Sequence, residues 1–350
     1  MKLSTRLAIT MVALVLLAAT SISTLIYHNV AAVALPRTLD RLDVHARLLA
    51  LELESSRRGA RFFVQGIVAT LPMRNMVLAR VGGGADPADG LTYSEWRARI
   101  AQDYLSEMSP RPDYLEIRLI GADDGREIIR VERAGPKGEI RIVPDAQLES
   151  QSEWDYFRRT IELPAGDVHV SPIELSPERR EANTPRIPVL RVAIPIHMAD
   201  GRVFGVMSID IGMRAVLDHI RSHPVRGGQV FVVNAQGDYL LHPDPAKEFG
   251  FQFDKPVRIQ DDFPEFAQLL SADDTTPRIV MDRAGERFGL GWNTVRIAGG
   301  PRVTIVETLP YPVLMAAAYS VRDISLLTRP CLRPTRRVVR VAGSSASSSV

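Results

Sequence analysis

The chain has 350 residues, of which 45% are hydrophobic and 24% are charged, close to the averages of globular proteins. This composition excludes collagen-like, disulfide-scaffold and wholly disordered chains. The 43 basic and 41 acidic residues leave a formal charge of +2, so bulk charge gives no support for nucleic-acid binding. Cys331 is the only cysteine, which excludes an internal disulfide and a cysteine zinc cluster.

The first predicted element is a transmembrane helix over residues 7–30. The run Leu7–Tyr27 contains no charged residue, and about 20 such residues span a bilayer as a helix. Lys2 and Arg6 precede the run, so the positive-inside rule places residues 1–6 in the cytoplasm. The chain is then expected to be a single-pass protein of the inner membrane whose remaining part is periplasmic.

A cleaved signal peptide is the alternative interpretation of this segment. Ala32-Val33-Ala34 has the small-x-small pattern of a cleavage site, and cleavage would release a free periplasmic protein. The apolar run is longer than the ~7–15 residues of a signal-peptide core. This length favours the membrane anchor.

A long helix over residues 31–81 is predicted to follow the membrane segment. Its apolar or small positions are spaced alternately four and three residues apart, a heptad pattern. They are Leu35, Leu39, Leu42, Ala46, Leu49, Leu53, Ser56, Ala60, Phe63 and Ile67. The pattern allows two arrangements, an amphipathic helix packed on its own domain or a helix pair across a homodimer. Both could hold in different stretches.

Strand-like segments then alternate with turn signals. A helix is expected at 93–108, and a shorter helix at 214–222 separates two groups of strands. Asp123-Asp124-Gly125 and Ala199-Asp200-Gly201 are hairpin signals. The expected strands are 114–120, 127–133, 190–196, 203–211, 229–233, 239–241, 278–282, 287–292 and 303–308.

This order predicts two related antiparallel-sheet modules in tandem, over residues 82–212 and 213–310. Helices that cover antiparallel sheets make an α+β fold. The full expectation is an N-terminal transmembrane helix, a long α-helix and the two sheet modules.

The end of the chain departs from this pattern. A helix is expected at 311–328, but only ten uncharged residues run from Pro312 to Val321, too few to span a membrane. Residues 329–350 are basic and then serine-rich, which is typical of disorder. We therefore expect a sensor truncated or frameshifted before its second span and output domain. The alternative is a basic tail that rests on anionic lipid.

Five phrases in order resemble the double-Cache extracytoplasmic sensors, whose modules are PAS-like, over about residues 35–325. They are Tyr114–Arg118 with Gly125 and Arg130, Asp155–Arg158, Pro188–Ala193, Asp200–Gly205, and Gly237–Pro245 with Glu248–Gly250. Such domains precede bacterial histidine kinases, diguanylate cyclases and chemoreceptors. The resemblance implies two tandem PAS-like (Cache) modules and a small-molecule site in the membrane-distal one.

The same resemblance implies a role for Asp210. Cache sensors of amino acids hold the ligand's amine with an aspartate at the end of the last distal strand, and Asp210 is similar in position. A strand carboxylate can pair with an ammonium group in a partly desolvated pocket. Period-two alternation places Val206, Ser208 and Asp210 on one face, opposite Met207 and Ile209. The alternative is that Asp210 only caps the following helix.

The carboxylate end of a ligand is less well specified. The amino-acid sensors clamp it with an arginine just before an aromatic pair, but no arginine immediately precedes Trp154 and Tyr156 here. Arg118, Arg130 and Arg191 lie in strand-like segments and are alternative anion-binding residues. Each of the three is equally compatible with an ion-paired face. The aromatic side chains could form a pocket wall or pack in the core.

No phosphate-binding glycine loop, nucleophile elbow or zinc-protease motif occurs in the sequence. His219 and His223 have the spacing of metal ligands but no obvious third ligand. We therefore expect neither enzyme activity, nor a metal, nor another cofactor. The expected function is a membrane-anchored sensor of a carboxylate or amino acid, homodimeric through the long helix. A free periplasmic ligand-binding protein or decoy is the alternative, followed by a periplasmic enzyme.

Overall fold

The computed structural model describes residues 3–29, 35–82, 90–134, 138–176, 187–270, 275–296 and 300–316. Residues Pro36–Leu314 form one compact unit, which contains both sheets. Helix α1 (Leu3–Asn29) lies outside this unit and is described by itself. Residues 311–316 are helical, and the rest of the expected exit helix and the expected tail lie outside the described residues.

No single helix among the described residues is both long enough and apolar enough to cross a membrane. In α1 the apolar stretch found covers Thr10–Ile22. Helices α2 (Leu35–Val68) and α3 (Leu71–Val81) are long and apolar enough to cross a membrane only when they are counted together as a bent pair, and only by length and composition. The transmembrane helix expected at 7–30 therefore stays a prediction.

The prediction of one helix over residues 31–81 is wrong in length. It is divided into α2 and α3, which are bent by 47° at the break. Pro72 lies in the first turn of α3, where its missing N–H costs nothing. Within a continuing helix its ring would clash with the carbonyl of Val68, four residues earlier. Val68 is the last residue of α2, so the proline accounts for the break.

The two sheets confirm the tandem arrangement that the strand pattern predicts. The first has the order β3-β2-β1-β6-β5-β4 and the second β8-β7-β11-β10-β9, with every pairing antiparallel. Without the edge strand β3, the two orders are the same, so the modules are topological repeats. The strands are β1 (Tyr114–Gly121), β2 (Glu127–Ala134), β3 (Glu139–Ile142), β4 (His169–Leu175), β5 (Pro188–His197), β6 (Val203–Gly212), β7 (Gln229–Asn234), β8 (Tyr239–Leu241), β9 (Arg278–Met281), β10 (Arg287–Arg296) and β11 (Arg302–Pro310).

The remaining helices are α4 (Tyr93–Met108), α5 (Asp155–Ile161), α6 (Arg214–Ser222), α7 (Ile259–Asp262) and α8 (Phe266–Leu269), with short 3-10 turns at Asp145–Gln147, Pro245–Lys247 and Gly250–Phe253. Helices α4 and α6 have the predicted bounds. The sequence pattern does not predict β3, β4 or α5. Two of these elements, β4 and α5, line a cavity described below.

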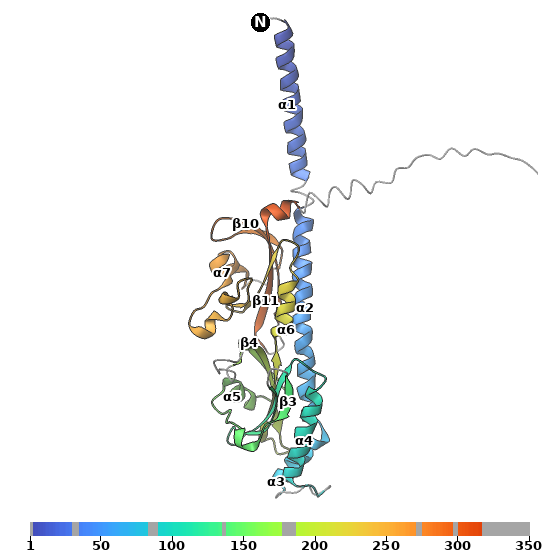
Figure 1. Cartoon of the computed structure of the whole chain (residues 1–350), viewed down its shortest axis with the longest axis vertical. Helices are drawn as coiled ribbons and strands as arrows, with labels where there is room; N and C mark the ends of the chain where they lie inside the picture. The colour runs from blue at the N-terminus through green and yellow to red at the C-terminus, as the bar shows by residue number, and fades with distance from the viewer. Residues whose placement is uncertain are drawn as a thin grey trace, which may run out of the picture. The chain divides into compact units, whose positions relative to one another are not determined.

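Helix α2 passes both sheets within the main unit (Figure 1). Leu49, Leu53 and Ala60 of this helix belong to a large apolar core that includes residues of both modules. Near its N-terminal end, His45 Nδ1 lies 2.8 Å from Oε2 of Glu307, a fully buried residue of β11. One helix therefore contacts both modules.

The heptad residues of α2 face its own chain. Leu42, Ala46, Leu49, Leu53 and Ala60 are all buried. This confirms the arrangement in which the helix packs on its own domain, and this face is not available to a second copy.

The two faces of the first sheet differ in character. Ile117, Met207 and Ile209 join α2, α3 and α4 in the main apolar core. The opposite face meets α5, where Ile120 and Val206 pack with Tyr156 and Phe157. The other strand residues on the α5 face, Glu116, Arg118, Ser208 and Asp210, are charged or polar, and they make up the centre of the predicted ligand site.

Candidate functional site

Asp210 lies in the sheet as the period-two pattern predicts, on the α5 face with Val206 and Ser208. Its neighbours across the strands are Glu116 of β1 and Arg191 of β5. The Asp210 carboxylate accepts hydrogen bonds from Arg191, at 2.6 Å from Nε to Oδ1 and 2.7 Å from Nη2 to Oδ2. Arg118 Nη1 lies 3.3 Å from Oδ2. Asp210 is therefore already held by two guanidinium groups of its own chain.

Carboxylates and arginines alternate in rows across this face. One row runs Glu132, Glu116, Asp210 and Arg191, and the next runs Arg130, Arg118 and Ser208. Like charges side by side in a row would repel each other, but each row neutralises the adjacent one.

Arg118 is the centre of this network, which we call the buried ion network. It pairs with Glu116, with Asp210 and, through Nε at 3.0 Å, with Glu127. Arg130 pairs with Glu127 at 3.1 Å and with Glu132 at 3.4 Å. Arg141 completes the set on Glu132 at 2.5 Å. Together with Arg191, which holds Asp210, the network has four carboxylates and four guanidinium groups. Arg118 is only 1% exposed.

Electrostatics keep Asp210 ionised in this interior. Burial alone raises the pKa of a carboxyl group, but the Arg191 and Arg118 guanidinium groups outweigh it and hold the pKa of Asp210 below its usual range. Ser208 is also buried, and its Oγ has no hydrogen-bond partner among the described residues. The alternative role of Asp210 as a helix cap is not observed, because α6 has no side-chain cap.

A cavity of about 420 Å³ lies beside this network, between α5, β4 and β5; we call it the α5 cavity. Its lining includes Trp154, Tyr156, Arg159, His169, Glu174 and Arg191. The Arg191 guanidinium carbon lies 4.1 Å from the centre of the Tyr156 ring, a cation–π contact. Arg191 therefore lies both on the cavity wall and on Asp210, while Asp210 itself is not part of the lining.

Two titratable groups in the α5 cavity were not singled out by the sequence analysis. Glu174 is half-buried, and it has no hydrogen bond or ion pair with a described residue. Burial and then the Asp155 carboxylate raise the pKa of Glu174, against the opposing effect of Arg191. Burial and the neighbouring Arg159 lower the pKa of His169. The pKa shifts of Glu174 and His169 thus both favour the neutral form of the side chain.

Tyr156 connects this cavity to the buried ion network. Its hydroxyl donates a 2.9 Å hydrogen bond to Gln151 Oε1, and Gln151 Nε2 donates at 3.0 Å to Glu127. Glu127 in turn pairs with Arg118. Tyr156 is thus a core residue and a wall residue at once, so both sequence interpretations of this aromatic position apply.

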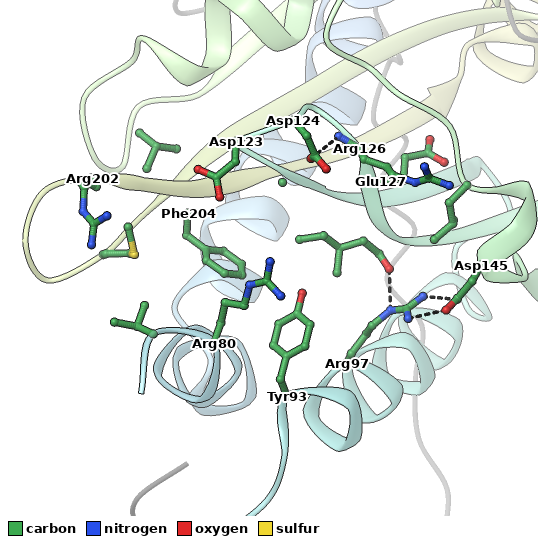
Figure 2. Close-up of a pocket in the computed structure, with 16 residues that line it drawn as sticks. Arg80, Tyr93, Arg97, Asp123, Asp124, Arg126, Glu127, Asp145, Arg202 and Phe204 are labelled. Carbon is green, nitrogen blue, oxygen red and sulfur yellow. Dashed lines mark hydrogen bonds and ion pairs between the residues drawn. The ribbon is translucent and has the colours of Figure 1, made fainter. Parts of the chain in front are cut away.

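A second cavity, of about 600 Å³, lies at the other end of the same sheet, where α3 and α4 meet two β-hairpins; we call it the hairpin cavity. Figure 2 shows Arg80 and Tyr93 on one side and Asp123 and Asp124 opposite them. The two cavities share no lining residue.

The chain matches the model of a protein family. Residues 93–276, more than half of the chain, match the bacterial histidine kinase sensor-domain family. The chain belongs to this family. Among curated proteins, none matches the chain.

Solved structures share the fold of this sensor domain at low identity. The extracellular domain of vpHK1S-Z8, named as a histidine kinase, has a TM-score of 0.63 at 16% identity and covers 85% of this chain and 100% of that one. A domain of a Vibrio parahaemolyticus protein named as sensory box/GGDEF has a TM-score of 0.63 at 15% identity, covering 80% and 99%. The ligand-binding domain of the Pseudomonas aeruginosa amino-acid chemoreceptor PctC, solved with GABA, has a TM-score of 0.52 at 14% identity, covering 78% and 99%.

These neighbours are Cache-type sensor domains, which confirms the resemblance that the sequence phrases indicate. The fold is the predicted mixture of helices and two antiparallel sheets. The matched family and structures are sensor or ligand-binding domains.

The sensor domain brings the seven predicted site residues to one face of its first sheet, but divides them into two groups. Trp154, Tyr156 and Arg191 line the α5 cavity. Arg118, Arg130, Ser208 and Asp210 lie behind it in or beside the buried ion network. Glu174 and His169 were missed because β4 was missed; a Ser-Pro-Ile-Glu-Leu stretch has no clear period-two pattern.

His219 and His223 do not form a metal centre in the described part of the chain, where no group of three or more potential ligands occurs. Their rings stack with centres 4.1 Å apart. His219 Nε2 lies 3.3 Å from the Glu52 carboxylate. This contact joins α6 to α2.

Proposed function

We propose that the chain is an extracytoplasmic sensor that binds a small amine-bearing ligand in the α5 cavity. The observation that carries the proposal is a carboxylate, Glu174, that has no hydrogen bond or ion pair with a described residue and lies in a cavity walled by Trp154 and Tyr156. Its volume of about 420 Å³ lies within the range of small-molecule sites. A ligand ammonium group would compensate the Glu174 charge and contact the Trp154 ring.

The cavity also favours a ligand with a carboxylate at its other end. Arg159 and Arg191 line it as well. Each already pairs with an aspartate of its own chain, Asp155 and Asp210 respectively, but a guanidinium group has five N–H donors and can bind a second carboxylate. A compound with both groups is an amino acid, and the similarly folded PctC domain was solved with GABA. Asp210 is not proposed to hold the amine directly, because Arg191 separates it from the cavity.

A signal would begin at contacts made by both modules. Gly300 and Pro301, which precede β11, line the α5 cavity together with residues of the first sheet. Strand β11 leads into the helical residues 311–316. A ligand that binds one arrangement of these contacts more tightly would shift the population toward it. The chain is proposed to bind its ligand without transforming it.

Glu174→Gln is expected to abolish ligand-dependent stabilisation of the full chain. Amino acids, organic acids, amines and polyamines are screened by thermal shift, and a compound with both an amine and a carboxylate is expected to raise Tm. A ligand at about 100 times its Kd stabilises by about 2.7 kcal/mol, and the substitution removes the ammonium's partner. Glu162→Gln, at an exposed acid outside the cavity, is the matched control.

The proposal fails if no compound shifts Tm, or if Glu174→Gln and Glu162→Gln respond equally. Asp210→Ala is a poor test of binding, because it leaves Arg118 and Arg191 without their shared carboxylate. A loss of response would then report unfolding.

We also propose that α1 anchors the chain in the inner membrane, with the sheets in the periplasm. The uncharged run Leu7–Tyr27, preceded by Lys2 and Arg6, supports this orientation. The apolar side chains Met11, Leu14, Leu17 and Leu25 are each 69–72% exposed. A bilayer would cover them.

We propose that two copies pair through the outer face of α2. Val44, Leu48, Leu51 and Phe62 are 55%, 58%, 53% and 66% exposed. With exposed Ser55 they follow a heptad spacing, opposite the seam buried on the chain's own sheets. Two parallel copies would bring the same residues together across a two-fold axis, and each would cover the other's apolar stripe.

Cysteine cross-linking in the membrane fraction tests both the pairing and the anchor. In a Cys331→Ser background, Leu48→Cys and Leu51→Cys are expected to form disulfide-linked dimers, because equivalent residues meet at the axis. Gln102→Cys, exposed on α4, is expected to stay monomeric. Equal cross-linking at all three positions contradicts the α2 pairing, and recovery of the chain in the soluble fraction contradicts the anchor.

A further inference from the structure

We propose that the hairpin cavity is a second small-molecule site, which takes a zwitterion: a compound with an anionic and a cationic group at opposite ends. The site is independent of the α5 cavity, because no lining residue is common to the two. Its volume of about 600 Å³ is within the range of ligand pockets.

The anion-binding side consists of Arg80 and Tyr93. Among the described residues, Arg80 has no ion pair or side-chain hydrogen bond; its guanidinium carbon lies 5.2 Å from the centre of the Tyr93 ring. Both side chains reach into the cavity (Figure 2). Stacking on an aromatic ring holds a guanidinium in place while leaving its N–H donors available. Arg80 could therefore donate two parallel hydrogen bonds to a ligand carboxylate.

Two of the other arginines that line the cavity already pair with carboxylates of their own chain, and Arg126 lines it on the hairpin side. Arg97 donates from Nε to the Ile128 carbonyl at 2.7 Å, and its other nitrogens pair with Asp145. Arg202 pairs with Asp200 at 2.8 Å. Arg80 is thus the positive group that the hairpin cavity presents from its helical side.

The opposite side is acidic. Asp123 has no hydrogen bond or ion pair with a described residue, and Asp124 only accepts from the Arg126 backbone N–H, at 2.9 Å. Their carboxylates face Arg80 and Tyr93 across the cavity in Figure 2. Neither carboxylate forms an ion pair with a described residue, although the Arg126 side chain also lines this side of the cavity. An ammonium group suits this side as a carboxylate suits the other.

The fold fixes where the acidic side of the hairpin cavity lies. Asp123 and Asp124 come from the β1–β2 hairpin, where Gly125 has φ of +64°. An added Cβ there would lie 2.7 Å from Ser152 Cβ, so the turn is held close to the segment before α5. Phe204, from the start of β6, supplies an apolar wall. The charges therefore lie on opposite walls, separated by aromatic surface.

The test is isothermal titration of the full-length chain with three zwitterions that differ only in the separation of their charges: glycine, γ-aminobutyrate and ε-aminocaproate. Caproate has only the carboxylate of ε-aminocaproate, and hexylamine has only its ammonium group. At least one zwitterion is expected to bind saturably and more tightly than either single-charge analogue. Arg80→Gln and Asp123→Asn are each expected to weaken it by about tenfold or more, as the loss of a charge-assisted hydrogen bond predicts.

The matched controls are Arg74→Gln and Asp103→Asn, exposed charges on α3 and α4 outside the cavity lining; neither is expected to change the affinity. The titrations are repeated with Glu174→Gln, which removes the acid of the α5 cavity. Binding that survives Glu174→Gln but not Arg80→Gln supports the second site, whether or not the α5 cavity binds anything. Binding lost only in Glu174→Gln, equal binding of caproate, or no saturable binding of any zwitterion overturns it.

Discussion

Arg118→Ala is expected to destabilise the first module by about 3–5 kcal/mol, the cost of removing one partner from a buried ion pair. The Arg118 guanidinium contacts Glu116, Glu127 and Asp210. Without it, three carboxylates would share a nearly dry interior with too few cations. Since domains are stable by about 5–15 kcal/mol in total, this loss is a large share. The unfolding midpoint in urea, followed by circular dichroism, measures it.

Arg74→Ala is the matched control, because Arg74 is exposed on α3 and a surface change of this kind is expected to stay within about 0.5 kcal/mol. Arg118→Met has a second use. It keeps the aliphatic volume but removes the charge, so it should be nearly as damaging as alanine if charge pairing is the cause. A near-normal midpoint for Arg118→Met would show that Arg118 acts mainly by filling space, and would contradict this account of the network.

Local patterns were sufficient to predict most of the sheet framework. Hairpin signals such as Asp123-Asp124-Gly125, with apolar strands on both sides, specify β1 and β2 within one residue at each end. The alternation along β6 likewise places Asp210 and Ser208 on the face opposite Met207. These features depend on residues that are neighbours in sequence, where propensity and periodicity act directly.

Contacts between distant residues could not be predicted in the same way. Arg118 and Asp210 are 92 positions apart in sequence, and no local pattern indicates that the arginine predicted to bind a ligand instead neutralises the aspartate. For each arginine the sequence also allows an ion-paired face, and Arg118, Arg130 and Arg191 all form such pairs. Glu174 was missed because Pro172 interrupts its strand pattern. The partners of a charge, more than its presence, decide whether it can bind a ligand.

The heptad pattern of α2 illustrates a related ambiguity. A seam of apolar residues specifies that one face is covered, but not by what. Leu42, Leu49 and Leu53 are covered by the chain's own modules, whereas Val44, Leu48 and Leu51 on the other face are exposed. Close packing of the first face requires small residues on the sheets, and a glycine of β10 meets this requirement.

Gly291→Ala is expected to separate α2 from the second sheet, at a cost of about 3 kcal/mol, the upper part of the usual range for overpacking. An added Cβ would lie 2.6 Å from the Leu42 carbonyl carbon and 2.7 Å from the Asp43 nitrogen. These are backbone atoms of a helix, which cannot rotate away. The neighbouring residues Leu290 and Trp292 are buried in the other core, so β10 cannot easily retreat.

Alanine substitutions at two further glycines are expected to change stability by different amounts. Gly289→Ala meets only the side-chain ends of Leu39 and Leu314, at 3.0 Å, so it should cost less than Gly291→Ala. Gly59→Ala, in α2 with nothing within 4 Å of its Cβ, should raise stability by about 0.5–1 kcal/mol through helix propensity. From the highest unfolding midpoint to the lowest, the expected order is therefore Gly59→Ala, the unchanged chain, Gly289→Ala and Gly291→Ala.

The His45–Glu307 contact makes the Gly291→Ala result informative about coupling. Burial raises the pKa of Glu307, against the opposing effects of the Val225 N–H and His45. A displaced α2 would carry His45 away from this carboxylate, so one added methyl group would break a polar contact that it does not touch. If Gly291→Ala leaves the midpoint unchanged, α2 can slide over the second sheet at little cost. Helix and sheet would then be mechanically independent, and a signal could not pass between them through this contact.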